Sequence, residues 1–296
     1  MPYNRRWLIV TRAGASSLHD GWLIGHTSPK FDLLISAYDK PVFRSQTSHV
    51  DMEYRPGSKV AGYAALFRDR PELLQHYDRI ALIDDDIATD VDTLNRMFQL
   101  AEQYDLKIAQ PALTRNSHFT FAALLAQPSL TLRYVNYIEM MCPVFRSDAL
   151  ETSLPLFEMG FESGIDLIWC NLLDAPERSF AVLDACPVHH TRSVGRAKAL
   201  NGFKDGRRYE DDIYALLRQF DLPWLPCLPY AAIDGRGRLI DGQTITGRLR
   251  LWISALQALV ALPGPYPKGR ARKILVHWHH LLRKTPRNLP RQMPGL

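Results

Sequence analysis

The chain has 296 residues, of which 46% are hydrophobic and 23% are charged. These proportions exclude an intrinsically disordered chain and supply enough apolar side chains for a full hydrophobic core. No run of 18 apolar residues occurs, and the opening stretch MPYNRRWLIVT predicts a first strand, so we expect neither a membrane-spanning helix nor a signal peptide. Four widely spaced cysteines without a CxxC pair argue against a zinc ribbon or a disulfide framework and predict a cytoplasmic protein.

The positive charge is concentrated in the last quarter of the chain. Residues 1–221 carry 24 Lys and Arg against 29 Asp and Glu, a net charge of −5. Residues 222–296 carry 12 against 2, a net charge of +10. We therefore predict two parts, a domain over 1–221 and a basic extension over 222–296.

Strand-like and helix-like stretches alternate in the first part. Short apolar runs predict buried strands at 6–11, 31–38, 79–84 and 106–113. Helices are predicted over 57–69, with Ser58 as N-cap, and over 91–104, where apolar residues recur at intervals of three and four. This β-α-β-α-β order predicts an α/β fold with a mostly parallel sheet flanked by helices.

The rest of the chain is less regular. We predict two strands over 131–146 with a kink before Pro143, and a further strand over 179–188. Helices are predicted over 147–158, 163–173 and 207–220 and, in the extension, over 245–262 and 269–284. The extension is therefore predicted to be helical as well as basic.

Three consecutive aspartates follow the strand predicted at 79–84. In open α/β sheets ligands bind outside the carboxyl ends of the strands, where Asp84 and Asp86 can aim at one point. A hard cation, Mn²⁺ or Mg²⁺, would relieve their repulsion, and Asp85 would either position a ligand or stay solvated. The alternative is a solvated acidic turn in which Asp90 or Asp92 caps the next helix.

Further polar residues lie where they could join such a site. Arg12 ends the first strand and Lys59 begins a helix, so both could meet a diphosphate. Asp39 ends the second strand and could accept ribose or base hydrogen bonds. His189 follows a late strand and could complete the shell of a cation, a structural histidine being the alternative.

Three more acids are candidates for proton transfer. Glu162 and Asp166 are four residues apart, so on a helix they share a face. Asp166 stands among apolar residues, where burial would raise its pKa and suit a general base, although a carboxylate stabilised by the helix dipole is the alternative. Glu139, in the strand-like stretch YIEMM, has the same two interpretations.

Several motifs resemble, in order and spacing, the family called domain of unknown function 707. They are AYDK, GSKVAGYAALF, YDRIALIDDDI, LKIAQPAL, YIEMMCPVFRSDAL, SGIDLIWCNL and FAVLDACPVHH. The match covers roughly residues 7–195, and IAQPAL and IEMMCPVF are its most specific segments. The family looks like a glycosyltransferase of the GT-A type, so the resemblance implies a GT-A-like catalytic domain over 1–221.

The resemblance also implies roles for particular residues. Asp84 and Asp86 match the two acids of a DxD-type motif, which holds Mn²⁺ or Mg²⁺ against the diphosphate of a nucleotide sugar. The family pattern usually has Glu at the middle position, so Asp85 departs from it. His189 matches a further metal ligand, and Asp166 matches the catalytic base or an acceptor contact. Asp39 and Lys59 align near the expected nucleotide site, whereas His190 and the following TRSVGR differ from the family continuation.

The implied reaction moves a sugar from a nucleotide diphosphate donor to a hydroxyl of a glycan or glycolipid acceptor, and surface-polysaccharide biosynthesis is one setting for such a reaction. A metal would act there as Lewis acid and orienting template. Two alternatives remain open. One is a metal-dependent phosphohydrolase built on the same Asp and His residues, and the other is a nucleotide- or glycan-binding protein without turnover.

The basic extension lies outside the resemblance. Trp252 and Trp278 stand among leucines and arginines, so its helices could lie on the inner face of a membrane as a peripheral contact. The alternative is that the leucines pack on the domain and the basic side chains stay solvated. We expect no nucleic-acid partner, since no recognition motif accompanies the charge. The HWHH stretch at 277–280 is interpreted as a packing face.

Overall fold

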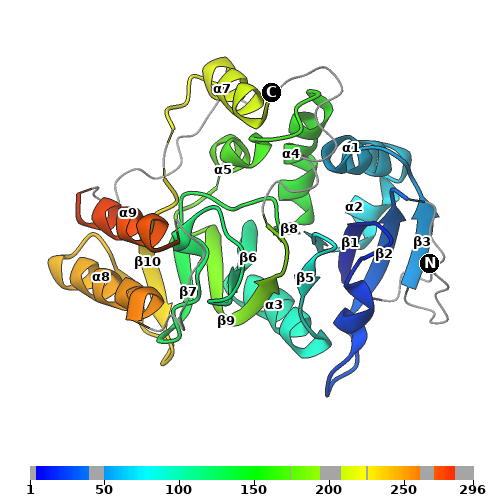
Figure 1. Ribbon diagram of the computed structural model, residues 1–296. Coiled ribbons are helices and arrows are strands. Elements are labelled where there is room, and N and C mark those ends of the chain that lie inside the picture. The colour runs from blue at the N-terminus through cyan, green and yellow to red at the C-terminus, as the bar shows by residue number, and fades with distance from the viewer. Residues whose placement is uncertain are drawn as a thin grey trace.

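A computed structural model describes residues 5–39, 50–173, 175–193, 208–224, 226–260 and 270–283. The chain forms one mixed sheet with helices on both faces (Figure 1), which confirms the predicted α/β class. In the order of the sheet, the strands are β11 (Leu239–Asp241), β10 (Pro229–Asp234), β7 (Leu130–Val135), β9 (Phe180–His190), β6 (Ile108–Leu113), β8 (Val144–Arg146), β4 (Arg79–Leu82), β1 (Trp7–Ala13), β2 (Phe31–Ala37) and β3 (Val50–Tyr54). A short strand, β5 (Ile87–Ala88), pairs with β9 off this path.

Most of these strands run in the same direction. β1 is parallel to both β2 and β4, and β2 is parallel to β3. β8 is antiparallel to its neighbours β4 and β6, so β6 keeps the direction of β4, and β9 is parallel to β6. β7 and β11 are reversed as well. The sheet is therefore mostly parallel in direction, with isolated reversed strands.

The α-helices are α1 (Lys59–Asp69), α2 (Glu72–His76), α3 (Val91–Gln103), α4 (Ser147–Glu158), α5 (Trp169–Leu172), α7 (Tyr209–Gln219), α8 (Ile245–Val260) and α9 (Arg270–Arg283). Short 3₁₀ turns, η1 (His19–Leu23), η2 (Ala122–Leu124) and η3 (Ile165–Leu167), connect them. Asp90 caps α3, since its side chain accepts from the Thr93 amide at 2.7 Å.

The two faces of the sheet carry different helices. Phe98 of α3 stacks on Trp7 of β1 with ring centroids 5.1 Å apart. Phe31, the β2 partner of Trp7, also faces α3, since its ring centroid lies 6.1 Å from that of Phe98. Arg12 lies an odd number of residues after Trp7 and so points to the opposite face, where it packs against Gly62 of α1. In Figure 1, α1, α4 and α5 accordingly lie above the strands and α3 below them.

Two regions differ from the sequence prediction. The single helix expected over 163–173 is wrong, because residues 165–172 form η3 and α5 with Ile168 between them. No helix begins at 163, since Gly164 adopts a positive φ of 87°. The expected kink before Pro143 is an irregular loop over 136–143, and Glu139 lies in this loop rather than in a strand.

The extension contains the predicted helices α8 and α9 and also two strands that sequence periodicity missed. β10 pairs with β7 and β11 pairs with β10, so residues after 222 continue the sheet of the domain. Leu251 of α8 packs with Ile240 of β11, and Trp252 and Trp278 stack on each other at 4.6 Å. Burial lowers the pKa of His277 to about 3. Leu251, Trp252 and Trp278 thus serve packing. Within the described ranges no helix is long and apolar enough to cross a membrane.

Candidate functional site

The acidic triplet lies where the strand order of the sheet reverses. From β1 the chain adds β2 and β3 on one side, and β4 then pairs with β1 on the other side. Such a switch point is where open α/β sheets bind ligands, at the carboxyl ends of the strands. Asp84, Asp85 and Asp86 follow β4 at this point, and Gly14 follows β1.

Asp84 is paired with Lys59, the first residue of α1. The Lys59 Nζ also donates to the Met140 carbonyl at 2.6 Å, so one ammonium connects the end of β4 to the 136–143 loop. Burial raises the pKa of Asp84, and Lys59 opposes that rise. The predicted neighbourhood of Asp84 and Lys59 is therefore present.

Asp86 is paired with His190. Its Oδ2 lies 3.3 Å from His190 Nε2, and His190 Nδ1 lies 2.9 Å from the His118 carbonyl. Because carbonyl and carboxylate oxygens only accept, His190 donates through both ring nitrogens and is an imidazolium when it bonds Asp86. Burial opposes this charge, but the bond to Asp86 raises the pKa of His190. Burial alone would raise the pKa of Asp86, but the bond to His190 outweighs it and lowers that pKa. The Oδ1 of Asp86 is buried and has no hydrogen-bond partner among the described residues.

The partner of Asp86 is thus the neighbour of the predicted histidine. His189 is paired with Ala88 in the β5–β9 register, and His190 is paired with Ile87. Successive strand side chains point to opposite faces, so His189 points away from the side on which His190 meets Asp86. The strand continues to residue 190, beyond the predicted end at 188, and this extra length decides which histidine faces the acid. The placement of His189 beside the aspartates is corrected to His190.

The described residues contain no group of three or more His, Cys, Asp or Glu side chains arranged to hold a metal ion. Mg²⁺ and Mn²⁺ are often bound by one or two carboxylates, with substrate phosphates and water as the remaining ligands. The unpaired, buried Oδ1 of Asp86 and the neighbouring Asp84 carboxylate fit such a cation. The donor set therefore suits a metal that arrives with a phosphate ligand rather than a preformed metal cage.

Asp85 is 9% exposed and is not a solvated turn residue. Its carboxylate accepts from the Gly14 amide at 2.8 Å, from Tyr38 Oη at 3.3 Å and from Arg192 Nη1 at 3.3 Å. Burial, followed by the charge of Asp85, raises the pKa of Tyr38 to about 12. Asp85 therefore joins the ends of β1 and β2 to the segment after β9.

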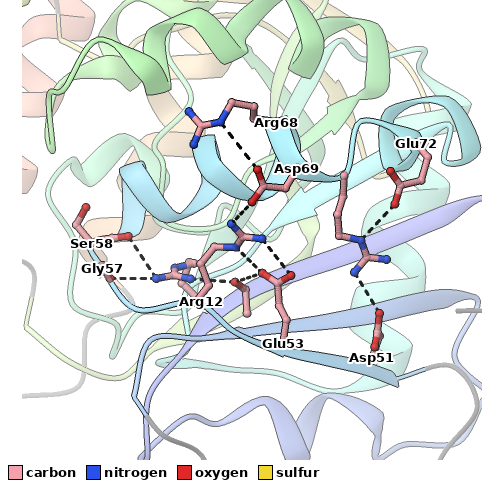
Figure 2. Close-up of polar contacts among 11 residues, drawn as sticks. Arg12, Asp51, Glu53, Gly57, Ser58, Arg68, Asp69 and Glu72 are labelled. Atoms are coloured by element: carbon pink, nitrogen blue, oxygen red, sulfur yellow. Dashed lines mark hydrogen bonds and ion pairs between the residues drawn. The ribbon is translucent and has the colours of Figure 1, made fainter.

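Arg12 is 4% exposed and its guanidinium donates to protein acceptors (Figure 2). It bonds Ser36 Oγ at 2.9 Å and the Gly57 carbonyl at 3.0 Å. Ser36 in turn donates to Glu53 at 2.8 Å. The predicted contact of Arg12 with a diphosphate is therefore replaced by a positioning role, in which Arg12 holds the turn before Lys59.

Asp39 follows β2 and is exposed, and its contact with a nucleotide stays a prediction.

Glu139 is buried, and it interacts electrostatically with Asp166, which is partly exposed. Asp166 Oδ2 accepts from Tyr137 Oη at 2.6 Å and from the Met140 amide at 3.2 Å. Burial raises the pKa of Asp166, and burial together with the Asp166 charge raises the pKa of Glu139 to about 7. Glu139 is 8% exposed, and its Oε2 has no hydrogen-bond partner among the described residues. An acid with a pKa near 7 and an open oxygen is suited to proton transfer.

Glu162 does not share a helix face with Asp166, because the left-handed Gly164 separates them. Its carboxylate accepts from Ser58 Oγ, and its amide donates to Asp212 of α7 at 2.9 Å. These bonds hold the turn before α1 against α7. These contacts give Glu162 a positioning role, and its predicted catalytic role stays a prediction.

Sequence reasoning missed three polar residues at this site: Tyr137, His190 and Arg192. His190 and Arg192 are two residues apart, which is the spacing of strand residues on one face. Tyr137 has the same relation to Glu139. Burial raises the pKa of Tyr137 well above its usual value, so it donates to Asp166 as a neutral hydroxyl.

Comparison with protein-family models and with curated protein sequences finds no match. Among solved structures, the chain is similar to S. aureus TarS 1–349 in complex with UDP-GlcNAc, with a TM-score of 0.41 and 9% identity over 94% of this chain and 72% of that one. It is also similar to CMP:2-keto-3-deoxy-manno-octonic acid synthetase complexed with CTP, with a TM-score of 0.30 and 13% identity over 51% of this chain and 78% of that one. Similarities this weak carry no argument about ligand or activity.

Proposed function

We propose that the protein is a metal-dependent glycosyltransferase of the GT-A type, which moves a sugar from a nucleotide diphosphate donor to an acceptor hydroxyl. The observation that supports it best is the convergence of Asp84, Asp86 and Lys59 at the switch point of the sheet, beside the acids Glu139 and Asp166. The resemblance of the motifs to the domain of unknown function 707 supports the same reaction.

The residues around the acidic triplet would have two functions, to hold a metal ion and to contact the nucleotide-sugar donor. Asp84 and Asp86 would hold Mn²⁺ or Mg²⁺ together with phosphate oxygens of the donor, which supplies Lewis-acid stabilisation of the leaving diphosphate, and His190 would hold the Asp86 carboxylate in place. Lys59 adds a second positive charge beside Asp84, where it can meet a phosphate oxygen. Asp85 and Tyr38 line the donor side, at the ends of β1 and β2.

Glu139 is the general base in this proposal. Its open Oε2 takes the proton of the acceptor hydroxyl as that oxygen forms the new glycosidic bond and the bond to the diphosphate breaks. Burial raises the pKa of Glu139 to about 7, and the charge of Asp166 adds to that rise. The transfer rate should therefore rise with pH through about 7, as the Glu139 carboxylate forms.

Calorimetric titration with UDP, GDP and CMP, each with and without Mn²⁺, tests the donor site. We expect one of these nucleotides to bind only with the metal, and Asp84→Ala and Asp86→Ala to abolish that binding because they remove its carboxylate ligands. Asp90→Ala, which removes a helix cap at the other end of the same loop, is the control and should bind as the wild type does. Equal binding by all three variants would refute the assignment. Release of the donor sugar to water at the same rate with and without acceptors would favour a phosphohydrolase.

We also propose that the extension contacts an anionic membrane from the cytoplasmic side, where a glycolipid acceptor would be found. Ile245, Leu249 and Ile253 recur every four residues on α8, and all three are exposed. The basic charge of residues 222–296 complements anionic headgroups.

Vesicle co-sedimentation tests the membrane contact. The double variant Leu249→Glu and Ile253→Glu should bind vesicles with anionic lipid much more weakly than the wild type, since it removes two apolar contacts and adds two negative charges. Wild-type binding should also weaken as salt rises. The control places the same two charges elsewhere, by Tyr54→Glu and Tyr214→Glu at exposed aromatic residues of β3 and α7. If both double variants bind like the wild type, α8 is not a membrane contact.

A further inference from the structure

An aromatic ladder leads from the protein surface to the acids of the candidate site. Trp224, between α7 and β10, is 51% exposed and stacks on Phe121 with ring centroids 6.0 Å apart and planes at 29°. Phe121 meets Tyr137 edge to face at 4.9 Å. Tyr137 Oη donates to Asp166 at 2.6 Å. Three rings thus connect an exposed indole with a carboxylate of the candidate site.

The segment after Trp224 is fastened to the loop that carries these acids. Asn136 Nδ2 donates to the Pro226 carbonyl at 3.1 Å, and the Leu228 amide donates to Asn136 Oδ1 at 2.7 Å. The Cys227 thiol lies 3.6 Å from the Tyr137 carbonyl. The Asn136 side chain thus holds the segment just after Trp224 at two points, Pro226 and Leu228. Asn136 is the first residue of the loop that carries Glu139.

The ladder and the donor residues lie on opposite sides of the acidic triplet. Across the sheet, β1 and β2 lie on one side of β4, and β8, β6, β9 and β7 lie on the other. Tyr38 and Gly14 follow β2 and β1, whereas Phe121 follows β6 and Tyr137 follows β7. Figure 1 shows the same separation of β1 and β2 from β6 and β7. A nucleotide held at β1 and β2 would leave the ladder to the second substrate.

The chemistry of the ladder suits a sugar ring. The face of an indole carries partial negative charge and attracts the polarised C–H groups on the apolar face of a pyranose. Close to the rings, Thr120 hydrogen-bonds the Glu139 side chain, so polar groups adjoin the inner end of the aromatic surface. Trp224 is exposed and partly stacked at the outer end of the ladder, and the ring at the inner end, Tyr137, bonds Asp166. An exposed aromatic surface that leads to a few polar groups is typical of a ligand-binding site.

We propose that Trp224 and Phe121 form the acceptor subsite and that its ligand is a glycan whose pyranose ring stacks on the Trp224 indole. This inference rests on the proposed function, because it assigns the acceptor of that reaction. It brings residues after position 222 into the site, although the charge pattern separates them from the domain.

Binding to a glycan array is the test, performed with the full chain and its variants Trp224→Ala and Trp224→Phe. We expect the wild type to bind a set of glycans. Trp224→Ala should lose affinity on the order of tenfold, which is comparable to the loss when an aromatic side chain that stacks on a nucleic-acid base is replaced by alanine. Trp224→Phe should keep part of the affinity. Tyr54→Ala is the matched control, because Tyr54 is also 51% exposed but lies on β3 at the far side of the sheet.

The outcomes separate this inference from the proposed function. Wild-type binding to no glycan, or equal binding by wild type and Trp224→Ala, would overturn the subsite, even where metal-dependent nucleotide binding is observed. Glycan binding that depends on Trp224 without any nucleotide binding would retain the subsite and remove the transferase. Protection of Trp224 from acrylamide quenching by a binding glycan, absent in Trp224→Phe, would place the sugar on the indole itself.

Discussion

Replacing Glu139 with glutamine is expected to remove transfer and, at about pH 8, to stabilise the fold. Turnover should fall roughly 10²- to 10⁴-fold, because the amide cannot accept the proton of the acceptor hydroxyl. Nucleotide binding should persist, since Glu139 contacts neither Asp84 nor Asp86 by any hydrogen bond found among the described residues. A turnover assay with a calorimetric nucleotide titration measures both.

The stability gain follows from the raised pKa of Glu139. Burial and the Asp166 charge raise that pKa from 4.5 to about 7. Between these two values the folded chain holds a proton that the unfolded chain has lost, so the free energy of unfolding falls as pH rises. Glutamine removes this loss. The variant should gain on the order of 2 kcal/mol at about pH 8, after the cost of a buried amide group, and should lack this gain at about pH 4.

Urea melts of the wild type, Glu139→Gln and Glu158→Gln at both pH values measure the effect. Glu158 ends α4 and its side chain is half exposed, so its glutamine variant should follow the wild type at each pH. A stability gain of the same size at both pH values would show that Glu139 is not a buried titrating acid. Unchanged turnover in Glu139→Gln would remove it as the base, and Asp166→Asn would then be the next variant to assay.

The sequence predicted the position of the triplet because that prediction needs only local information. An apolar run of strand length that ends in three acids defines a strand end, and the alternation of strands and helices defines a parallel sheet. The place of Lys59 near the site followed from the same topology, since α1 begins at the carboxyl edge of the sheet, whereas its ion pair with Asp84 is seen only in the structure. These features survive errors of one or two residues in an element boundary.

Features that change when an element boundary shifts by one residue could not be predicted. The choice between His189 and His190 turns on strand parity, which reverses if a strand end shifts by one residue. Arg12 looks like a phosphate ligand because it ends a strand. Its two Nη atoms instead donate to Ser36 and to the Gly57 carbonyl, neighbours that only the fold brings to it.

Long-range proximity hid the raised pKa of Glu139, which the sequence had named only as one of three candidate acids, and it hid the aromatic ladder. Glu139 acquires its pKa from burial and from Asp166, which is distant in sequence. Trp224 lies beyond the boundary that the charge pattern placed at 222, yet Asn136 holds the residues that follow it. Composition describes the average of a segment, whereas a binding site depends on which segments the sheet brings side by side.

The adjacent histidines offer the sharpest test of the metal assignment. His190→Ala should weaken Mn²⁺-dependent nucleotide binding on the order of 10- to 100-fold, which is the usual effect of removing a group that ligates a metal or orients a ligand. The physical reason is specific. His190 Nε2 faces Asp86 while its Nδ1 bonds the His118 carbonyl, an arrangement that fixes the ring and the position of the carboxylate.

His189→Ala is the matched control, because it removes the same side chain from the same strand but on the side turned away from Asp86. It should bind nucleotide and Mn²⁺ as the wild type does. His190→Gln serves as a second variant that keeps a polar side chain in a buried position and so limits any loss of folding, which thermal melts of all three variants would detect. A larger loss in His189→Ala than in His190→Ala, with equal melting temperatures, would return the metal site to His189 and contradict the register of β5 and β9.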